Sequence, residues 1–83
     1  MNNLELKFAR QREGLSQREM AEAIEKSLDS YSKKERGEVS FFTDEILKAT
    51  LRLNLTYDQF NLIFFDNYLP FRKNDSSLSE ILT

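Results

Sequence analysis

Cysteine and histidine are both absent from this 83-residue sequence, and each absence excludes a class of chemistry. Without cysteine, the chain forms neither disulfides nor thiolate metal sites, which suits a reducing cytoplasm. Without histidine, it lacks the commonest general base and metal ligand. The remaining side chains form no arrangement typical of catalysis, so we expect neither an enzyme nor a bound metal or cofactor.

Glycine and long apolar runs are also scarce. The only two glycines, Gly14 and Gly37, stand where helices are expected to end, which leaves no glycine-rich phosphate loop. Residues 1–13 are charged throughout, unlike a signal peptide, and no stretch approaches the length of a membrane span. We therefore expect one small, soluble, cytoplasmic domain with no membrane partner.

The charge of the chain favours nucleic acid only locally. The formal net charge is −2, from 12 Lys and Arg against 14 Asp and Glu, whereas nucleic-acid-binding modules are usually basic. Residues 26–36 depart from this balance, because they hold more cations than acids: Lys26, Lys33, Lys34 and Arg36 against Asp29 and Glu35. The positive field is therefore weak and confined to this segment.

Capping residues and apolar spacing predict five short helices around one core. We expect helices over residues 4–13, 17–25 and 28–36, a fourth helix capped by Thr43, and a fifth opened by a Thr56–Gln59 capping box. Apolar residues at helical spacing predict the inward positions. These are Leu6, Ala9, Met20, Ala21, Ile24, Ile46, Leu47, Thr50, Leu51, Phe60, Ile63 and Phe64.

The run from Leu15 to Gly37 has the size and spacing of a helix-turn-helix. Ser16 and Glu19 form a capping box, and Ser27 offers a second cap. Two helices of about two turns, separated by three or four residues, form the unit that can place its second helix in a DNA major groove.

Several short segments of this region resemble the Cro/repressor-type (XRE) helix-turn-helix family, common in phage repressors and bacterial regulators. They are Gly14-Leu15-Ser16-Gln17, Met20-Ala21 and Ser32-Lys33-Lys34-Glu35-Arg36-Gly37. Residues 43–65 resemble the two closing helices of the family, so the resemblance covers residues 4–65. Tyr31-Ser32, Phe41-Phe42 and Ile63-Phe64-Phe65 are most similar to phage-type regulators of low-GC Gram-positive bacteria.

The resemblance implies an all-α, five-helix, lambda-repressor-like DNA-binding domain over residues 1–66, with the helix-turn-helix at 17–36. It also implies roles for residues of the motif. The base-contact positions are Ser27, Leu28, Asp29 and Lys33, and the phosphate-contact positions are Gln17, Ser30, Lys34 and Arg36. Lysine can donate to guanine O6 and N7, aspartate can accept from cytosine N4, and leucine can touch a thymine methyl. Plain structural roles stay open: Asp29 can stabilise the helix start, Leu28 can fill part of the core, and Gln17 can be solvated.

Arg10 and Glu35 are interpreted as a structural ion pair, because related repressors tie their first helix to the end of the third in this way. The turn between the two motif helices departs from the family, since Glu25 replaces its glycine and Lys26 the apolar residue that follows. Glu25 must adopt a left-handed conformation, or the turn must be rearranged.

Aromatic residues near the end of the chain exceed what a small core needs. Residues 67–83 form an aromatic and then polar tail, whose end is expected to be flexible. A dimer or partner surface is expected at Phe65, Tyr68, Leu69 and Phe71. The alternative is that this tail packs back onto its own domain.

Together these features predict a sequence-specific DNA-binding transcriptional regulator, a phage-like repressor that binds a double-stranded operator as a homodimer. The alternative is a protein-interaction module on the same fold, similar to an antirepressor or antitoxin, that binds another regulator or a toxin. The acidic composition and the aromatic surplus favour this second interpretation.

Overall fold

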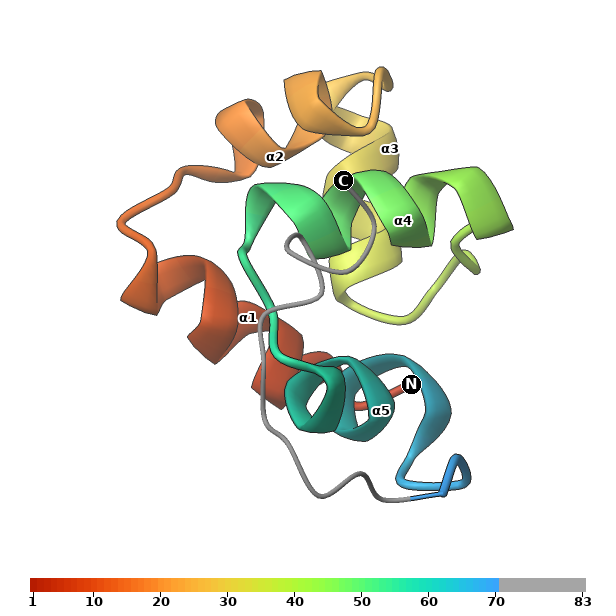
Figure 1. The fold of residues 1–83 in the computed structure, drawn as a ribbon. Coiled ribbons are helices and arrows are strands. Elements are labelled where there is room, and N and C mark those ends of the chain that lie inside the picture. The colour runs from red at the N-terminus through yellow and green to blue at the C-terminus, as the bar shows by residue number, and fades with distance from the viewer. Residues whose placement is uncertain (71–83) are drawn as a thin grey trace.

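The computed structural model describes residues 1–70, which form five α-helices (Figure 1). The helices are α1 (Asn3–Arg12), α2 (Gln17–Ala23), α3 (Leu28–Glu35), α4 (Thr43–Arg52) and α5 (Tyr57–Phe65). The expected all-α class is confirmed, and the first three helices end one or two residues before their predicted ends. Within residues 1–70, no helix combines the length and apolar character that a membrane span requires.

The helices pack in two groups that share one core. α2 packs against α3 and α4, while α1 packs against α5 and α3, as Figure 1 shows. The backbone N–H of Asn2 donates to the carbonyl of Ile63 at 2.7 Å, which fixes the start of α1 beside α5. The buried core consists of Leu6, Ala9, Leu15, Met20, Ala21, Ile24, Tyr31, Ala49, Leu53, Leu55 and Ile63.

Short-range capping signals account for three helix starts. Ser16 with Glu19 and Thr56 with Gln59 form complete capping boxes, as predicted from their spacing. Ser27 caps α3 by accepting a hydrogen bond from the backbone N–H of Ser30 at 3.1 Å. These caps depend only on residues three positions apart, which is why the sequence alone predicts them.

α4 differs from its prediction at its start and on its inward face. Phe42 occupies the N-cap position instead of Thr43, and its N–H donates to the Glu45 carboxylate at 2.8 Å. Leu47 and Leu51 were expected in the core, but they are 43% and 40% exposed. Thr50 is buried as predicted, but its buried neighbours are Glu45, Ala49 and Leu53. The helix is rotated so that Glu45 reaches a buried lysine of α3, an interaction that hydrophobic spacing does not indicate.

The turn between α2 and α3 is tight although it contains no glycine. Glu25 adopts a left-handed conformation with φ of 60°, the first of the two predicted alternatives. The N–H of Lys26 donates to the carbonyl of Ala21 at 2.9 Å, which closes the end of α2. The Glu25 carboxylate forms an ion pair with Lys48 of α4, so Glu25 also ties this turn to α4.

The chain folds back after α5 through a feature that sequence reasoning missed. Asp66 and Asn67 both have positive φ, and they reverse the chain direction. The buried side-chain amide of Asn61 then donates to the carbonyl of Leu69 at 2.8 Å and accepts from the N–H of Leu69 at 2.9 Å. Residues 66–70 are therefore held against α5, as the alternative of a tail packed on its own domain predicts for this part. Residues 71–83, including Phe71, lie outside the described residues.

Candidate nucleic-acid interface

α3 has one face in the core and one face in solvent. Tyr31, Lys34 and Glu35 are buried, and they anchor the helix against the rest of the domain. The four predicted base-contact residues lie on the accessible side: Ser27, Leu28 and Asp29 are exposed, and Lys33 is partly exposed. The structure thus leaves these side chains available to an external partner.

Lys33 and Asp29 form an ion pair that links two predicted base-contact residues. Their Nζ and Oδ2 atoms are 3.0 Å apart, one helical turn from each other, and the side chains are 45% and 75% exposed. An exposed pair of this kind is weak, because water and salt screen it. A base edge can therefore compete with Asp29 for the lysine at little cost.

Arg36 and Gln17, two of the predicted phosphate-contact residues, lie beside this face. Arg36 forms an ion pair with Glu38, and its Nη1 donates to the Ser32 hydroxyl at 2.6 Å. Gln17 Nε2 donates to Glu35 Oε1 at 3.3 Å, which leaves a second N–H on the same nitrogen. Ser30 is half-buried.

Lys34 is a correction to the predicted phosphate contacts. Its side chain is only 3% exposed, and its Nζ lies 2.7 Å from Glu45 Oε1. The same Nζ donates to the carbonyl of Ser40 at 3.3 Å and lies 4.9 Å from the centre of the Phe42 ring. These groups take the place of water around the ammonium, so Lys34 joins α3 to α4 and is withdrawn from the surface.

The predicted Arg10–Glu35 pair is present and involves two hydrogen bonds. Arg10 Nε donates to Glu35 Oε2 at 2.9 Å, and Nη2 donates to Oε1 at 3.1 Å. Arg10 Nη1 also donates to the carbonyl of Leu15 at 2.8 Å, so the pair fixes the α1–α2 loop as well. Burial by itself raises the pKa of Glu35, but the hydrogen bonds and charge of Arg10, together with Tyr31 and Gln17, outweigh it and hold that pKa below its ordinary value.

Carboxylates neutralise most of the positive charge around α3. Lys33, Lys34 and Arg36 each have an acidic partner, and Lys26 lies 3.8 Å from Glu45. Among residues 1–70, the cations without an acidic partner are Lys7, Arg12 and Arg18. The expected basic cluster at residues 26–36 is therefore weaker in the folded protein than a count of charges suggests.

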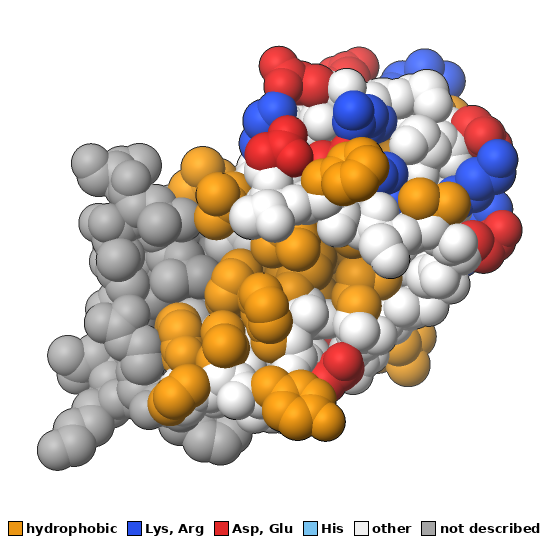
Figure 2. Space-filling model, turned by 90° about the vertical axis from the view of Figure 1, so that its right-hand side faces the viewer, with side chains coloured by type: hydrophobic (Ala, Val, Ile, Leu, Met, Phe, Trp, Pro, Cys, Tyr) orange, Lys and Arg blue, Asp and Glu red, His pale blue; other side chains and the backbone are white. Residues whose placement is uncertain are grey.

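A second candidate surface is apolar and lies around α5. Phe65 is 36% exposed and Tyr68 is 89% exposed, whereas Leu69 is half-buried. The Phe60 ring contacts both Phe64 and Phe65, with centroids 6.0 and 5.1 Å apart. Figure 2 shows hydrophobic side chains over the middle and lower part of one face, with most charged side chains toward its top and right edge.

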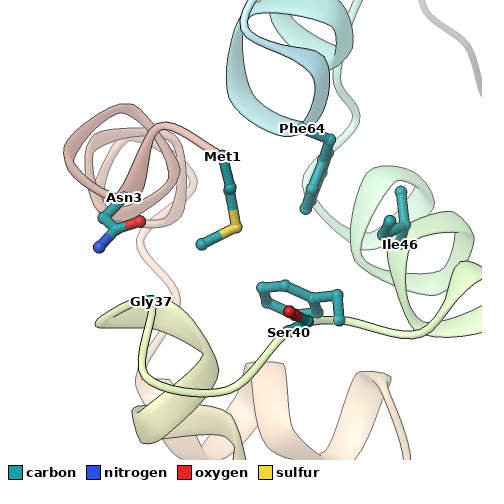
Figure 3. Close-up of a pocket in the computed structure, with 7 residues that line it drawn as sticks. Met1, Asn3, Gly37, Ser40, Ile46 and Phe64 are labelled. Carbon is teal, nitrogen blue, oxygen red and sulfur yellow. The ribbon is translucent and has the colours of Figure 1, made fainter.

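A cavity of about 370 Å³ lies between the start of α1, the α3–α4 loop, α4 and α5. Figure 3 shows the Met1 and Phe64 side chains extending into this space, with Ile46 at its edge. The Phe64 ring also packs edge-on against Phe41, with centroids 5.6 Å apart. None of the described residues that line the cavity is Lys, Arg, Asp or Glu, and the N-terminal ammonium of Met1 is already paired with Asp66 at 3.0 Å.

No protein-family model, curated protein or solved structure matches this chain. The function of the protein is therefore inferred from the geometry of α3 and the side chains around it, and from the resemblance of residues 14–17, 20–21 and 32–37 to the helix-turn-helix family named above.

Proposed function

We propose that this protein is a sequence-specific DNA-binding transcriptional regulator of the phage-repressor type. In this proposal the domain is lambda-repressor-like, and α2 and α3 are its helix-turn-helix. One observation carries the proposal: α3 follows α2 after a tight turn, buries one face, and leaves Ser27, Leu28, Asp29 and Lys33 accessible on the other. This is the arrangement that insertion of a helix into a major groove requires.

Each accessible side chain of α3 supplies a contact that a base edge can use. Lys33 donates to O6 and N7 of a guanine once its pair with Asp29 opens, and Asp29 is then free to accept from cytosine N4. Leu28 packs on a thymine methyl, and Ser27 donates its hydroxyl proton. Arg36 and Gln17 contact phosphates and set the register of the helix, with Ser30 beside them. A bound operator then blocks access of RNA polymerase to the promoter.

Selection of random duplex DNA by the purified protein tests this proposal. We expect enrichment of one palindromic sequence, and we expect Lys33→Ala to weaken its binding about tenfold or more, because a good bidentate base contact contributes about 1–3 kcal/mol of discrimination. Arg12→Ala is the control, since it removes one positive charge from an exposed residue of α1, outside α2, α3 and the turn between them. Folded wild-type protein that enriches no sequence would contradict the proposal.

We also propose that the protein acts as a homodimer joined through Phe65 and Tyr68, because a palindrome needs two recognition helices about one DNA turn apart. We expect light scattering at micromolar concentration to give about twice the chain mass of 9.8 kDa. Tyr68→Ser is expected to shift this mass toward the monomer, because the side chain is 89% exposed and available to a partner. A 9.8 kDa species alone, at every concentration tested, would exclude the dimer.

A protein-interaction module, similar to an antirepressor or antitoxin, is the second candidate function. The observation in its favour is the pairing of Lys33, Lys34 and Arg36 with carboxylates, which lowers the positive charge that DNA would meet. A protein partner would instead use the exposed Phe65 and Tyr68. Lys33→Ala separates the candidates, because it should weaken operator binding about tenfold or more and leave the binding of a partner on the apolar surface unchanged.

A further inference from the structure

A cleft of about 490 Å³ lies between α1, the start of α2 and α3. The cleft is lined by Asn3, Leu4 and Lys7 of α1, Gln17 of α2, Ser32 and Glu35 of α3, and Arg36, which caps the end of α3. We call this space the Lys7 cleft. It adjoins the accessible face of α3, because Ser32 lies one turn from both Asp29 and Arg36 on that helix.

Lys7 is the uncompensated charge of this cleft. It is exposed, and no carboxylate of residues 1–70 forms an ion pair with it. The other charged groups of the cleft are already paired, since Glu35 is held by Arg10 and Gln17, and Arg36 is held by Glu38. Glu35 is also only 4% exposed, so it offers little repulsion to an incoming anion.

Two unused donors line the same cleft as Lys7. Gln17 Nε2 has one N–H beyond the bond to Glu35, and the Nη2 of Arg36 has no partner among the described residues. A phosphodiester group matches this set, because it carries one negative charge and accepts several hydrogen bonds at once. A carboxylate ligand has the same charge, but it is not part of a sugar-phosphate backbone that could continue along α3.

We propose that the Lys7 cleft binds one backbone phosphate of duplex DNA, with Lys7 as its cation and Gln17 and Arg36 as flanking donors. The inference rests on the proposed function and extends it to α1, which sequence reasoning assigned only a structural role. A phosphate held here lies beside the groove that α3 enters, and it fixes the register of the protein without selecting a base.

The salt dependence of DNA binding tests the cleft. Fluorescence anisotropy with the selected duplex and with a mixed-sequence duplex, over a range of salt concentrations, gives the slope of log K against log salt. We expect Lys7→Ala to reduce the magnitude of this slope by about 0.9, the contribution of one phosphate. We also expect it to weaken binding to both duplexes by the same factor. Discrimination between the two duplexes should not change, in contrast to the result for Lys33→Ala.

Arg12→Ala is the matched control for this experiment. It removes one unpaired cation from the same helix, but Arg12 does not line the cleft. We expect its slope to equal that of the wild type, and thermal melting checks that both variants are folded. Equal slopes for Lys7→Ala and Arg12→Ala would overturn the cleft proposal and leave the proposed function standing. Failure of folded wild-type protein to bind either duplex would overturn both.

Discussion

Lys34→Ala is expected to lower the free energy of unfolding by about 3 kcal/mol, because it leaves Glu45 buried without its main partner. Glu45 has no exposed surface, and Lys34 Nζ lies 2.7 Å from its Oε1. Two weaker contacts remain in the variant, the N–H of Phe42 at 2.8 Å and Lys26 at 3.8 Å. Because these contacts remain, we expect a loss of unfolding free energy at the lower end of the range of about 3–5 kcal/mol for breaking a buried ion pair. Urea denaturation near pH 7 measures it.

The loss caused by Lys34→Ala should shrink in acid. Burial raises the pKa of Glu45, but the hydrogen bonds from Lys34 and Phe42 outweigh it and hold that pKa below its ordinary value of 4.5. Because the pKa of Glu45 is lowered in the folded state, the pair stabilises the protein fully at pH values above the ordinary pKa. This contribution is lost as the pH falls through the lowered pKa of the folded protein. A loss of stability that is unchanged from pH 7 to pH 3 would contradict this account of Glu45.

A double variant separates the structural role of Lys34 from the phosphate contact first expected of it. Lys34→Met with Glu45→Met removes both buried charges, and we expect stability to return to within about 1 kcal/mol of the wild type. The remaining deficit reflects the lost acceptor for the Phe42 N–H. Because Lys34 is not at the surface, the salt slope of DNA binding should be unchanged. A reduced slope would show that Lys34 does reach a phosphate.

Glu35→Ala, at the residue that follows Lys34, is expected to have a comparable effect of about 3 kcal/mol. It leaves the Arg10 guanidinium, whose side chain is 12% exposed, without its carboxylate partner. It also removes the acceptor of the hydrogen bond from Gln17. The pKa of Glu35 is also held low by Arg10 against the effect of burial, so this contribution is likewise present above pH 4.5 and lost on acidification. Urea denaturation at several pH values measures both features.

Glu38→Ala is the matched control for Glu35→Ala. It removes a carboxylate three residues further along, and this carboxylate pairs with Arg36 at the surface with 54% of its side chain exposed. We expect its midpoint of denaturation to match that of the wild type, because solvent screens exposed pairs. Equal effects of the two substitutions would mean that the Arg10–Glu35 pair is not a structural tie.

Elements defined by neighbouring residues were predictable from the sequence. The caps at Ser16, Ser27 and Thr56 each use a hydrogen bond between positions three apart, so their spacing is enough to place the start of a helix. Gly14 and Gly37 end their helices with positive φ, which follows from the absence of a side chain. The Arg10–Glu35 pair spans 25 positions, and only the family resemblance indicated it.

Apart from the Arg10–Glu35 pair, contacts between residues far apart in the sequence were predicted wrongly or not at all. The spacing of apolar residues placed Leu47 and Leu51 in the core, but the helix turns Glu45 inward because Lys34 is buried opposite it. The Asn61 amide looked like an ordinary polar side chain of α5, yet it holds Leu69 through two hydrogen bonds. Neither polar contact leaves a periodic signal in the sequence.

The sequence by itself determined five short helices and the caps of α2, α3 and α5, because each of these depends on the chemistry of nearby residues. Only the tertiary structure decided which charges face a partner. Folding buries Lys34 against Glu45, pairs Lys33 with Asp29 and Arg36 with Glu38, and leaves Lys7 without an acidic partner among residues 1–70. The physical reason is that the strength of a charge at a surface depends on its burial and its nearest counter-charge, and both are set by helix packing.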